Sequence, residues 1–212
     1  MSDTAVTPQT LIDNSLARKK DSGKTQWADA ELLVYLNDAL SYINDLLIEH
    51  DSELVISDGT ITMVASTQEY TLDGNLDDFY AMVPKGVYFS SETDSLTPAN
   101  YEEKIANGST TTDVVPTIYY LTATKLGVIP IPTATAVAVD NTLNCRYFTM
   151  HTDLALDGTM PYKNLFNRPV KMFMSNIALL RNENSKSADI AALYNVLEAE
   201  VLKIVNKRTP GV

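Results

Sequence analysis

Cysteine and histidine are scarce in this chain. Its 212 residues include one cysteine, Cys145, and two histidines, His50 and His151. A single cysteine excludes an internal disulfide framework, and so few soft ligands disfavour a typical structural zinc site. The scarcity of cysteine is typical of proteins from a reducing compartment.

Long apolar runs are also missing. No window approaches the roughly 18 apolar residues that a membrane-spanning helix needs. The first residues, Met1 to Thr4, do not open a basic stretch followed by an apolar one, so we expect neither export by that route nor a membrane anchor. The chain is nevertheless 45% hydrophobic and 20% charged, which predicts a substantial core and excludes a mostly disordered protein.

Positive charge is in deficit. The 16 basic residues face 27 acidic ones, a net charge of −11. Such a field repels phosphate backbones and anionic membranes, which disfavours general nucleic-acid binding. The deficit is uneven: residues 161–212 have eight basic and four acidic side chains, a balance of +4, whereas residues 1–160 have eight basic and 23 acidic ones, a balance of −15. The sequence describes an acidic body with a basic tail.

Both ends of the chain have helical patterns. Thr7-Pro8 predicts the start of a short helix that runs to about Lys20, and Asp29 is a candidate N-cap for a helix of about 20 residues. Near its C-terminus the chain has a second helical pair, in which we expect Pro169 to separate a short opening turn from the main helix. The apolar positions that support these helices are Leu32, Leu33, Leu36, Leu40, Ile43 and Leu47, then Leu165, Phe166, Val170, Phe173, Ile177 and Leu180, and finally Ile190, Leu193, Leu197, Val201 and Ile204.

The middle of the chain has the period of β-strands. Strand-like runs occupy residues 60–65, 69–72, 79–89, 117–124, 125–129 and 143–149. Four Asx-Gly pairs predict tight turns: Asp58-Gly59, Asp73-Gly74, Asn107-Gly108 and Asp157-Gly158. Residues 129–132 contain two prolines and therefore belong at a strand end or sheet edge. Residues 100–106 favour a short helix.

The order of these patterns predicts an α+β fold. Terminal helices form a small bundle, and a central antiparallel β-rich insertion lies between them in sequence. We expect N-terminal helices in residues 1–52, the β-rich insertion in residues 53–159, and a C-terminal helical hairpin with a docking tail in residues 160–212.

The best metal-binding motif begins at Asp73. It offers oxygen ligands at the first, third and fifth positions of a calcium loop through Asp73, Asn75 and Asp77, but its sixth position is Asp78 and its twelfth is Pro84. Calcium loops require glycine and glutamate at those two positions. An acidic hairpin turn is the better interpretation, and a small calcium- or carbohydrate-binding module is kept as an alternative.

Catalytic motifs are absent. The chain has no nucleophile elbow, phosphate loop or dinucleotide fingerprint. Arg146 beside Cys145 could activate the thiol, but a small buried core residue is the simpler interpretation. Six tyrosines of the middle region could form a stacking platform for single-stranded nucleic acid, although the acidic balance favours roles in the core or in interfaces: Tyr70, Tyr80, Tyr88, Tyr119, Tyr120 and Tyr147.

Several segments together resemble a known family. These are Trp27-Ala-Asp-Ala-Glu-Leu-Leu-Val-Tyr-Leu-Asn-Asp-Ala39, the tyrosine-rich Pro116–Tyr120, the Pro-x-Pro edge at Ile129–Pro132, and the final helical hairpin. Their order resembles that of the head-to-tail adaptor (connector or neck) proteins of tailed bacteriophages. The similarity spans most of the chain.

The resemblance implies a virion structural protein with no enzymatic activity, cofactor or metal. Such adaptors bind beneath the portal ring, typically as twelve copies, extend the DNA channel and provide the platform for tail or nozzle proteins. Double-stranded DNA would pass through the lumen without sequence-specific binding, which an acidic wall favours. The protein would reside in the virion neck, after assembly in the host cytoplasm.

The resemblance also implies two contact segments. The portal-binding segment comprises Leu202, Lys203, Val205, Asn206, Lys207, Arg208, Thr209, Pro210, Gly211 and Val212. The tail-side loop comprises Asp73, Gly74, Asn75, Leu76, Asp77 and Asp78. Lys203 and Lys207 also have a simpler role, because cations at a helix C-terminus complement the helix dipole. The alternatives are another neck or tail-completion protein, the binding module described above, and an enzyme that uses Cys145 or His151.

Overall fold

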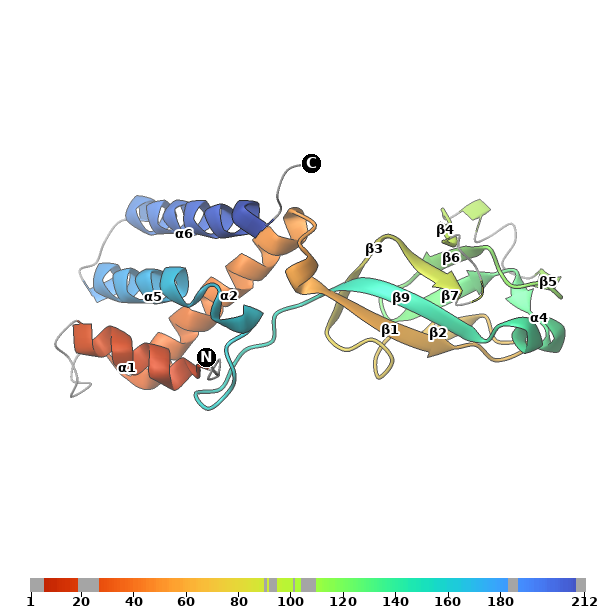
Figure 1. The fold of residues 1–212 in the computed structure, drawn as a ribbon, viewed down its shortest axis with the longest axis horizontal. Coiled ribbons are helices and arrows are strands. Elements are labelled where there is room, and N and C mark those ends of the chain that lie inside the picture. Colours follow the sequence, from red (N-terminus) through yellow and green to blue (C-terminus); the bar gives the residue numbers. More distant parts are fainter. Residues whose placement is uncertain are drawn as a thin grey trace. The chain divides into compact units, whose positions relative to one another are not determined.

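The structure is a computed structural model, and it describes residues 6–18, 27–89, 91, 95–100, 102–103, 110–182 and 187–208. The chain divides into two compact units (Figure 1). The helical unit contains the residues up to Leu54 and those from His151 onward, and the β-rich unit contains Val55–Met150. This is the expected α+β fold with helices at both ends of the chain.

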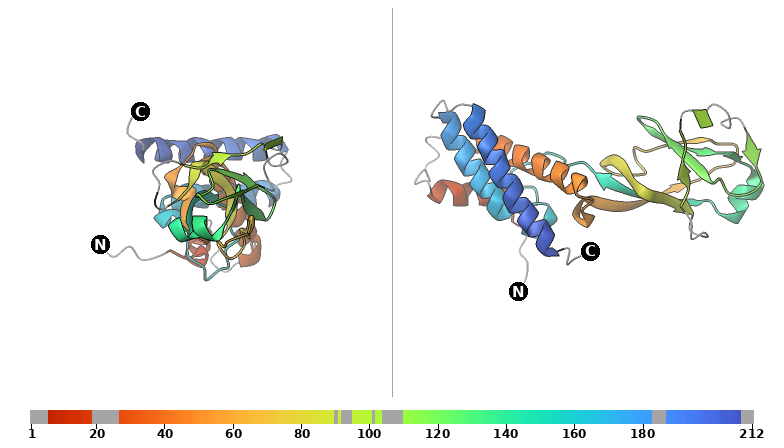
Figure 2. Two further views of the ribbon diagram at one scale, coloured as in Figure 1. Left: turned by 90° about the vertical axis from the view of Figure 1, so that its right-hand side faces the viewer. Right: turned by 90° about the horizontal axis from the view of Figure 1, so that it is seen from above.

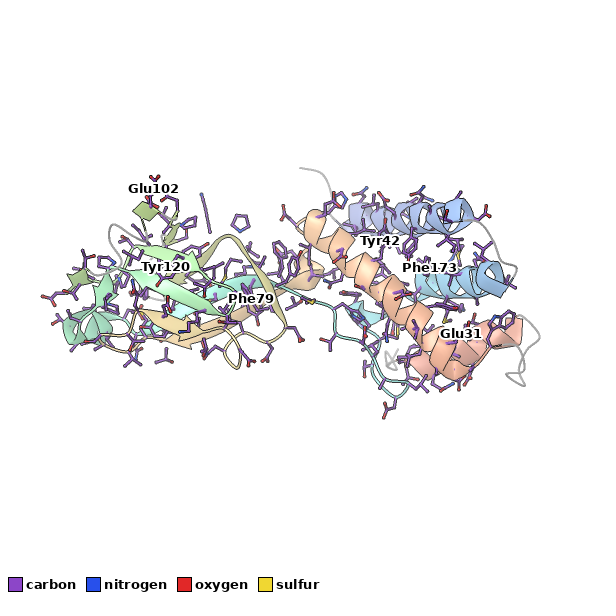
Figure 3. All side chains as sticks on the ribbon, turned by 180° about the vertical axis from the view of Figure 1, so that it is seen from behind. Glu31, Tyr42, Phe79, Glu102, Tyr120 and Phe173 are labelled. Atoms are coloured by element: carbon purple, nitrogen blue, oxygen red, sulfur yellow. The ribbon has the colours of Figure 1, made fainter. Side chains whose placement is uncertain are left out.

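Four long helices build the described part of the helical unit. They are α1 (Pro8–Arg18), α2 (Asp29–Glu49), α5 (Asn167–Asn182) and α6 (Ser187–Arg208). Helices α1, α5 and α6 lie side by side with α5 in the middle, and α2 crosses them diagonally on one face (Figures 1 and 3). The view from above shows α5 and α6 running alongside each other (Figure 2).

The core of this unit comes from the predicted apolar stripes. Leu36, Leu40, Ile43 and Leu47 of α2 are fully buried, and they share the interior with Ile12, Val170, Phe173, Ile177, Leu197 and Val201 from the other three helices. Each such side chain contributes about 1.5–3 kcal/mol when it leaves water. Tyr194 of α6 links the helices, because its ring lies 5.0 Å from that of Tyr42 and 4.8 Å from that of Phe173.

Two helix starts differ from the prediction. Asp29 is the first residue of α2 instead of its N-cap, a position that Ala28 occupies in extended geometry. The carboxylate of Asp29 remains in the first turn, where it complements the helix dipole. Pro169 lies inside the first turn of α5, where its missing N–H costs nothing. The short opening turn is the 3₁₀ helix η2 (Tyr162–Asn164).

The β-rich unit follows a short 3₁₀ helix, η1 (Glu53–Val55), and its described residues form three sheets. The first is antiparallel in the order β1 (Ile56–Thr62), β9 (Thr142–Thr149), β3 (Phe79–Phe89). The second has the order β2 (Glu69–Thr71), β7 (Lys125–Ile129), β6 (Ile118–Leu121), β4 (Thr97–Pro98), with β4 parallel to β6. The third pairs β5 (Thr111–Thr112) with β8 (Ile131–Pro132), and helix α4 (Ala134–Val139) follows.

The apolar side chains of this unit form one core. It includes Ile61, Met63, Val87, Phe89, Leu126, Val128, Leu143 and Cys145, all no more than 2% exposed. As predicted, the strand β7 ends at Ile129, before the prolines. The pair Ile131–Pro132 then forms only a two-residue strand.

The Asx-Gly pairs differ in structure. Gly74 lies in a turn with φ +77°, as predicted, and the amide of Gly158 donates to the Ala155 carbonyl oxygen at 3.0 Å in a turn. Gly59 is not in a turn, because it lies within β1 opposite Cys145. A Cβ on Gly59 would lie 2.6 Å from the side chain of Leu76, so close packing explains this glycine.

Two predicted features fall partly or wholly on residues outside the described ranges. One is the Asn107-Gly108 turn, and the other is most of the helix at residues 100–106. At the start of that helix, the Asn100 amide donates to the Glu103 carboxylate at 2.9 Å and the Glu103 amide donates to Asn100 Oδ1 at 2.8 Å. This reciprocal pair is a capping box.

Residues 151–159, which the sequence placed with the β-rich insertion, pack against helices. Asn37 of α2 accepts a hydrogen bond from the Leu154 amide at 3.0 Å and donates one to its carbonyl oxygen at 3.2 Å. The Gln9 amide of α1 donates to the Leu156 carbonyl oxygen at 3.1 Å. Within the described part of the chain, no helix combines the length and apolar character needed to cross a bilayer.

Candidate docking surfaces

The predicted tail-side loop is an exposed acidic turn between β2 and β3. Asp73, Gly74, Asn75, Asp77 and Asp78 are exposed, whereas Leu76 is 2% exposed and belongs to the core. The amides of Asn75 and Leu76 donate to the Leu72 carbonyl oxygen at 3.0 and 2.8 Å. Leu76 therefore anchors a loop whose polar residues project into solvent.

Further hydrogen bonds fix the shape of this loop. The Asn75 side chain donates from Nδ2 to the Thr71 carbonyl oxygen at 2.7 Å. Asp78 has φ +52°, and its carbonyl oxygen accepts from the Met150 amide at 2.7 Å. Among the described residues, no three histidine, cysteine, aspartate or glutamate side chains are grouped so that they could hold a metal ion.

The predicted portal-binding segment begins inside α6. Leu202 and Val205 are half-buried, and Lys203, Asn206 and Lys207 are exposed. The helix ends at Arg208, and Thr209, Pro210, Gly211 and Val212 lie outside the described residues. The described part of the segment thus combines half-buried apolar side chains with exposed polar ones.

The end of α6 is part of a basic cluster that includes one residue of α5. Lys203 Nζ donates to Glu200 Oε1 at 2.6 Å, and this bond and the lysine charge lower the pKa of Glu200. Arg168 at the start of α5, together with Lys207, lowers it further. The charges of three cations therefore act on one carboxylate, and Lys203 is the one that contacts it. Sequence reasoning singled out Lys203 and Lys207 but missed Arg168, because only packing brings α5 to this point.

Sequence reasoning also missed an apolar groove between α5 and α6. Its walls are Pro169, Met172, Phe173 and Asn176 from α5 and Leu193, Val196, Leu197 and Glu200 from α6. Met172 is 38% exposed and Val196 is 51% exposed. Both are apolar residues outside the core stripes of their helices, and that position on the helical wheel is the signal that could have revealed the groove.

Four of the six tyrosines considered as a stacking platform are buried, and Tyr80 and Tyr88 are the exposed ones. Tyr70, Tyr119, Tyr120 and Tyr147 are at most 8% exposed and Tyr80 is 52% exposed. The Tyr120 hydroxyl donates to Glu69 Oε1 at 2.9 Å. The prediction of core roles is therefore confirmed for the four buried tyrosines.

Cys145 is a core residue, as predicted. Its side chain is 1% exposed, and burial raises the pKa of the thiol to about 12. A nucleophilic cysteine needs a lowered pKa and access to substrate. Burial also lowers the pKa of His151, partly offset by the charge of Asp153. The surroundings of Cys145 do not support the enzyme alternative.

Comparison with known proteins identifies the family. The model of the SU10 adaptor protein family matches residues 6–200, which include the whole β-rich unit and most of the helical unit. A search of curated proteins finds no match. The chain belongs to the SU10 adaptor protein family and is a phage adaptor protein.

Proposed function

We propose that this protein is a head-to-tail adaptor that binds beneath the portal ring, extends the DNA channel and forms the platform for tail attachment. The family match over residues 6–200 is the observation that carries this proposal. On this proposal the protein is a structural part of the virion neck, is assembled in the host cytoplasm and has no enzymatic activity. The copies form a ring, and twelve is the expected number.

The portal contact is proposed for Leu202–Val212. Lys203, Asn206 and Lys207 are exposed on the last turns of α6 and are available to a partner. Basic side chains at this end contrast with the chain's net charge of −11 and give the segment a distinct electrostatic character. Such contrast favours docking in one orientation.

The tail contact is proposed for the Asp73–Asp78 loop. A rigid loop loses little conformational entropy on binding, and the hydrogen bonds to Leu72, Thr71 and Asp78 supply that rigidity. Asp73, Asp77 and Asp78 would then meet a basic or hydrogen-bond-donating surface on the tail protein.

The DNA channel is proposed to hold double-stranded DNA without adhesion. A protein of net charge −11 releases no counterions from phosphates and therefore gains no salt-dependent affinity for the duplex. DNA would slide past such a wall without sequence-specific binding.

The direct test mixes the purified protein with portal rings from the same virus and images the product by electron microscopy. We expect one closed additional ring. Deletion of Lys207–Val212 should leave the circular dichroism spectrum unchanged and weaken portal docking by about tenfold or more, since charged anchors are lost.

Lys85→Ala serves as the matched control, because it removes an exposed cation from the β-rich unit. It should leave portal docking unchanged. Equal docking by the deletion variant and the full chain would refute the assignment of this segment. A folded protein that forms no ring on the portal would refute the adaptor function itself and favour a neck protein that meets only the tail.

A further inference from the structure

A pocket lies between the Asp73–Asp78 loop and the turn that joins β6 to β7. Its volume is about 280 Å³. Small-molecule sites in proteins occupy about 300–1,000 Å³, so this pocket is better suited to one side chain of a partner protein. The described residues that line it are Leu72, Asp73, Leu76, Asp78, Phe79, Ala123 and Thr124.

The buried part of the pocket lining is apolar. Leu72 and Leu76 are 3% and 2% exposed, and both belong to the core of the β-rich unit. Phe79, the first residue of β3, has its ring 5.7 Å from that of Tyr147 on β9 (Figure 3). A side chain that entered the pocket would therefore rest on groups that the core already holds in place.

The exposed part of the lining is acidic and polar. Asp73 and Asp78 are exposed, and Thr124 adds a hydroxyl group. Neither lysine nor arginine occurs among the described residues of the lining. Lys125 follows Thr124 in the chain, but its Nζ contacts Glu69 Oε2 on β2 at 3.3 Å. The pocket thus combines an apolar floor with a negative rim.

Hydrogen bonds hold the two walls of the pocket in position. The Leu72 amide donates to the Thr124 carbonyl oxygen at 2.9 Å, which ties the loop to the turn. Within the turn, the Lys125 amide donates to Thr122 Oγ1 at 3.1 Å, and the Thr122 amide donates to the Lys125 carbonyl oxygen at 2.8 Å. Such a preformed pocket loses little conformational entropy when a partner enters it.

An apolar floor beneath two carboxylates fits a side chain with an apolar stem and a cationic end. Lysine and arginine both have that form. Arginine fits better, because its planar guanidinium has five donors for separate acceptors and stacks on aromatic rings such as that of Phe79. A guanidinium is also less strongly hydrated than an ammonium group, so it leaves water more readily.

We propose that this pocket receives one arginine side chain of the tail protein, with the guanidinium bound by Asp73 and Asp78 and the stem against Leu76 and Phe79. The inference rests on the proposed tail contact and deepens it, because it names the partner's residue and adds the β6–β7 turn as a second wall. Asp77 is exposed on the same loop but does not line the pocket. It therefore provides a control position.

Titration of the whole chain tests the pocket without portal or tail proteins. The probe is N-acetyl-L-arginine amide, followed by nuclear magnetic resonance through the backbone amide signals of Gly74 and Thr124. We expect saturable shifts of both signals. N-acetyl-L-lysine amide should bind at least about threefold more weakly. The citrulline analogue, which has a similar shape and no charge, should bind at least about tenfold more weakly.

Two variants of equal net charge locate the binding site. Asp73→Asn with Asp78→Asn removes both rim charges, and asparagine tolerates the φ of +52° at position 78. This variant should bind the arginine probe at least about tenfold more weakly than the wild type. The control, Asp77→Asn with Asp157→Asn, changes two exposed carboxylates outside the lining and should bind normally. The absence of saturable shifts in the wild type, or equal binding by the two variants, would overturn the proposal.

Binding of the tail protein to adaptor rings on the portal tests the source of the arginine. The Asp73→Asn, Asp78→Asn variant should bind the tail protein at least about tenfold more weakly, and the control variant should bind it normally. p-Benzoylphenylalanine in place of Ala123 should photo-cross-link to a tail-protein peptide that contains an arginine.

Replacing that arginine by glutamine should weaken binding to the wild-type adaptor by a similar factor. It should cause little further loss with the Asp73→Asn, Asp78→Asn variant, because the two changes remove the same contact. A captured peptide without arginine, or losses that simply add, would contradict the assignment.

These outcomes separate the inference from the proposed function. Normal tail binding by the Asp73→Asn, Asp78→Asn variant would remove the arginine contact and leave the adaptor function standing. A wild-type protein that binds the arginine probe but forms no ring on the portal would support the pocket and remove the adaptor function.

Discussion

At the residue scale, Gly127 and Tyr120 form one packing unit on neighbouring strands. They face each other across β6 and β7, and Glu69 of β2 pairs with Gly127 on the other side. A Cβ on Gly127 would collide with the Tyr120 ring. The ring covers the glycine, and its hydroxyl reaches Glu69, which also binds Lys125 at 3.3 Å. The absence of a side chain at Gly127 permits this arrangement.

Gly127→Ala should destabilise the protein by about 1–3 kcal/mol, because the added methyl group displaces the Tyr120 ring. Chemical denaturation of the β-rich unit measures the change. In a Tyr120→Leu background, the same substitution should lower the free energy of unfolding by clearly less, since the obstructing ring is gone. Equal costs in the two backgrounds would show that Tyr120 is not the cause.

At the element scale, α2 has two faces with different roles. Leu36, Leu40 and Ile43 on one side are fully buried, whereas Val34 on the other side is 55% exposed. An apolar side chain of α2 therefore stabilises the folded protein according to its position on the helical wheel. Its contribution to the free energy of unfolding depends on how much of it is buried, and not on its hydrophobicity alone.

Leu36→Ala should destabilise the helical unit by about 2–5 kcal/mol, through lost burial and a residual cavity. Val34→Ala should change stability by no more than about 0.5 kcal/mol. Urea denaturation followed by far-ultraviolet circular dichroism compares the two. Leu36→Asp should unfold the bundle, because it buries an unpaired charge. An unchanged transition for both Leu36 variants would contradict the assignment of the buried stripe.

At the scale of the whole molecule, the β-rich unit begins and ends on neighbouring strands. Ile56 of β1 pairs with Phe148 of β9, and Thr149 Oγ1 donates to the Val55 carbonyl oxygen at 3.2 Å. Because the two ends meet, the unit can be removed without opening its own core. The helical unit likewise has its own buried interior.

Residues 55–150 expressed alone should fold. We expect a cooperative thermal transition and a β-type circular dichroism spectrum, since the core of this unit comes from its own strands. The helical unit with residues 55–150 replaced by a short Gly-Ser linker is the companion protein, and it should remain helical. A non-cooperative transition for residues 55–150 would mean that this unit requires the helices.

Much of the fold is local and could be predicted from the sequence. Strand β3 has the bounds Phe79–Phe89 that its residues predict, and α1 begins at Pro8 as expected. The helical stripes of α2 and the positive φ of Gly74 follow from periodicity and from the conformational freedom of glycine. These features depend on residues within a few positions of each other.

The sequence by itself therefore determined the α+β class, most of the elements, the buried stripes and the acidic turn at Asp73–Asp78. The tertiary structure alone decided that Gly59 lies in a strand under Leu76, and that Arg168 joins Lys203 beside an apolar groove. The physical reason is distance along the chain. Hydrophobic periodicity and turn propensity act over a few residues, whereas packing contacts and surface electrostatics depend on which distant segments the fold brings together.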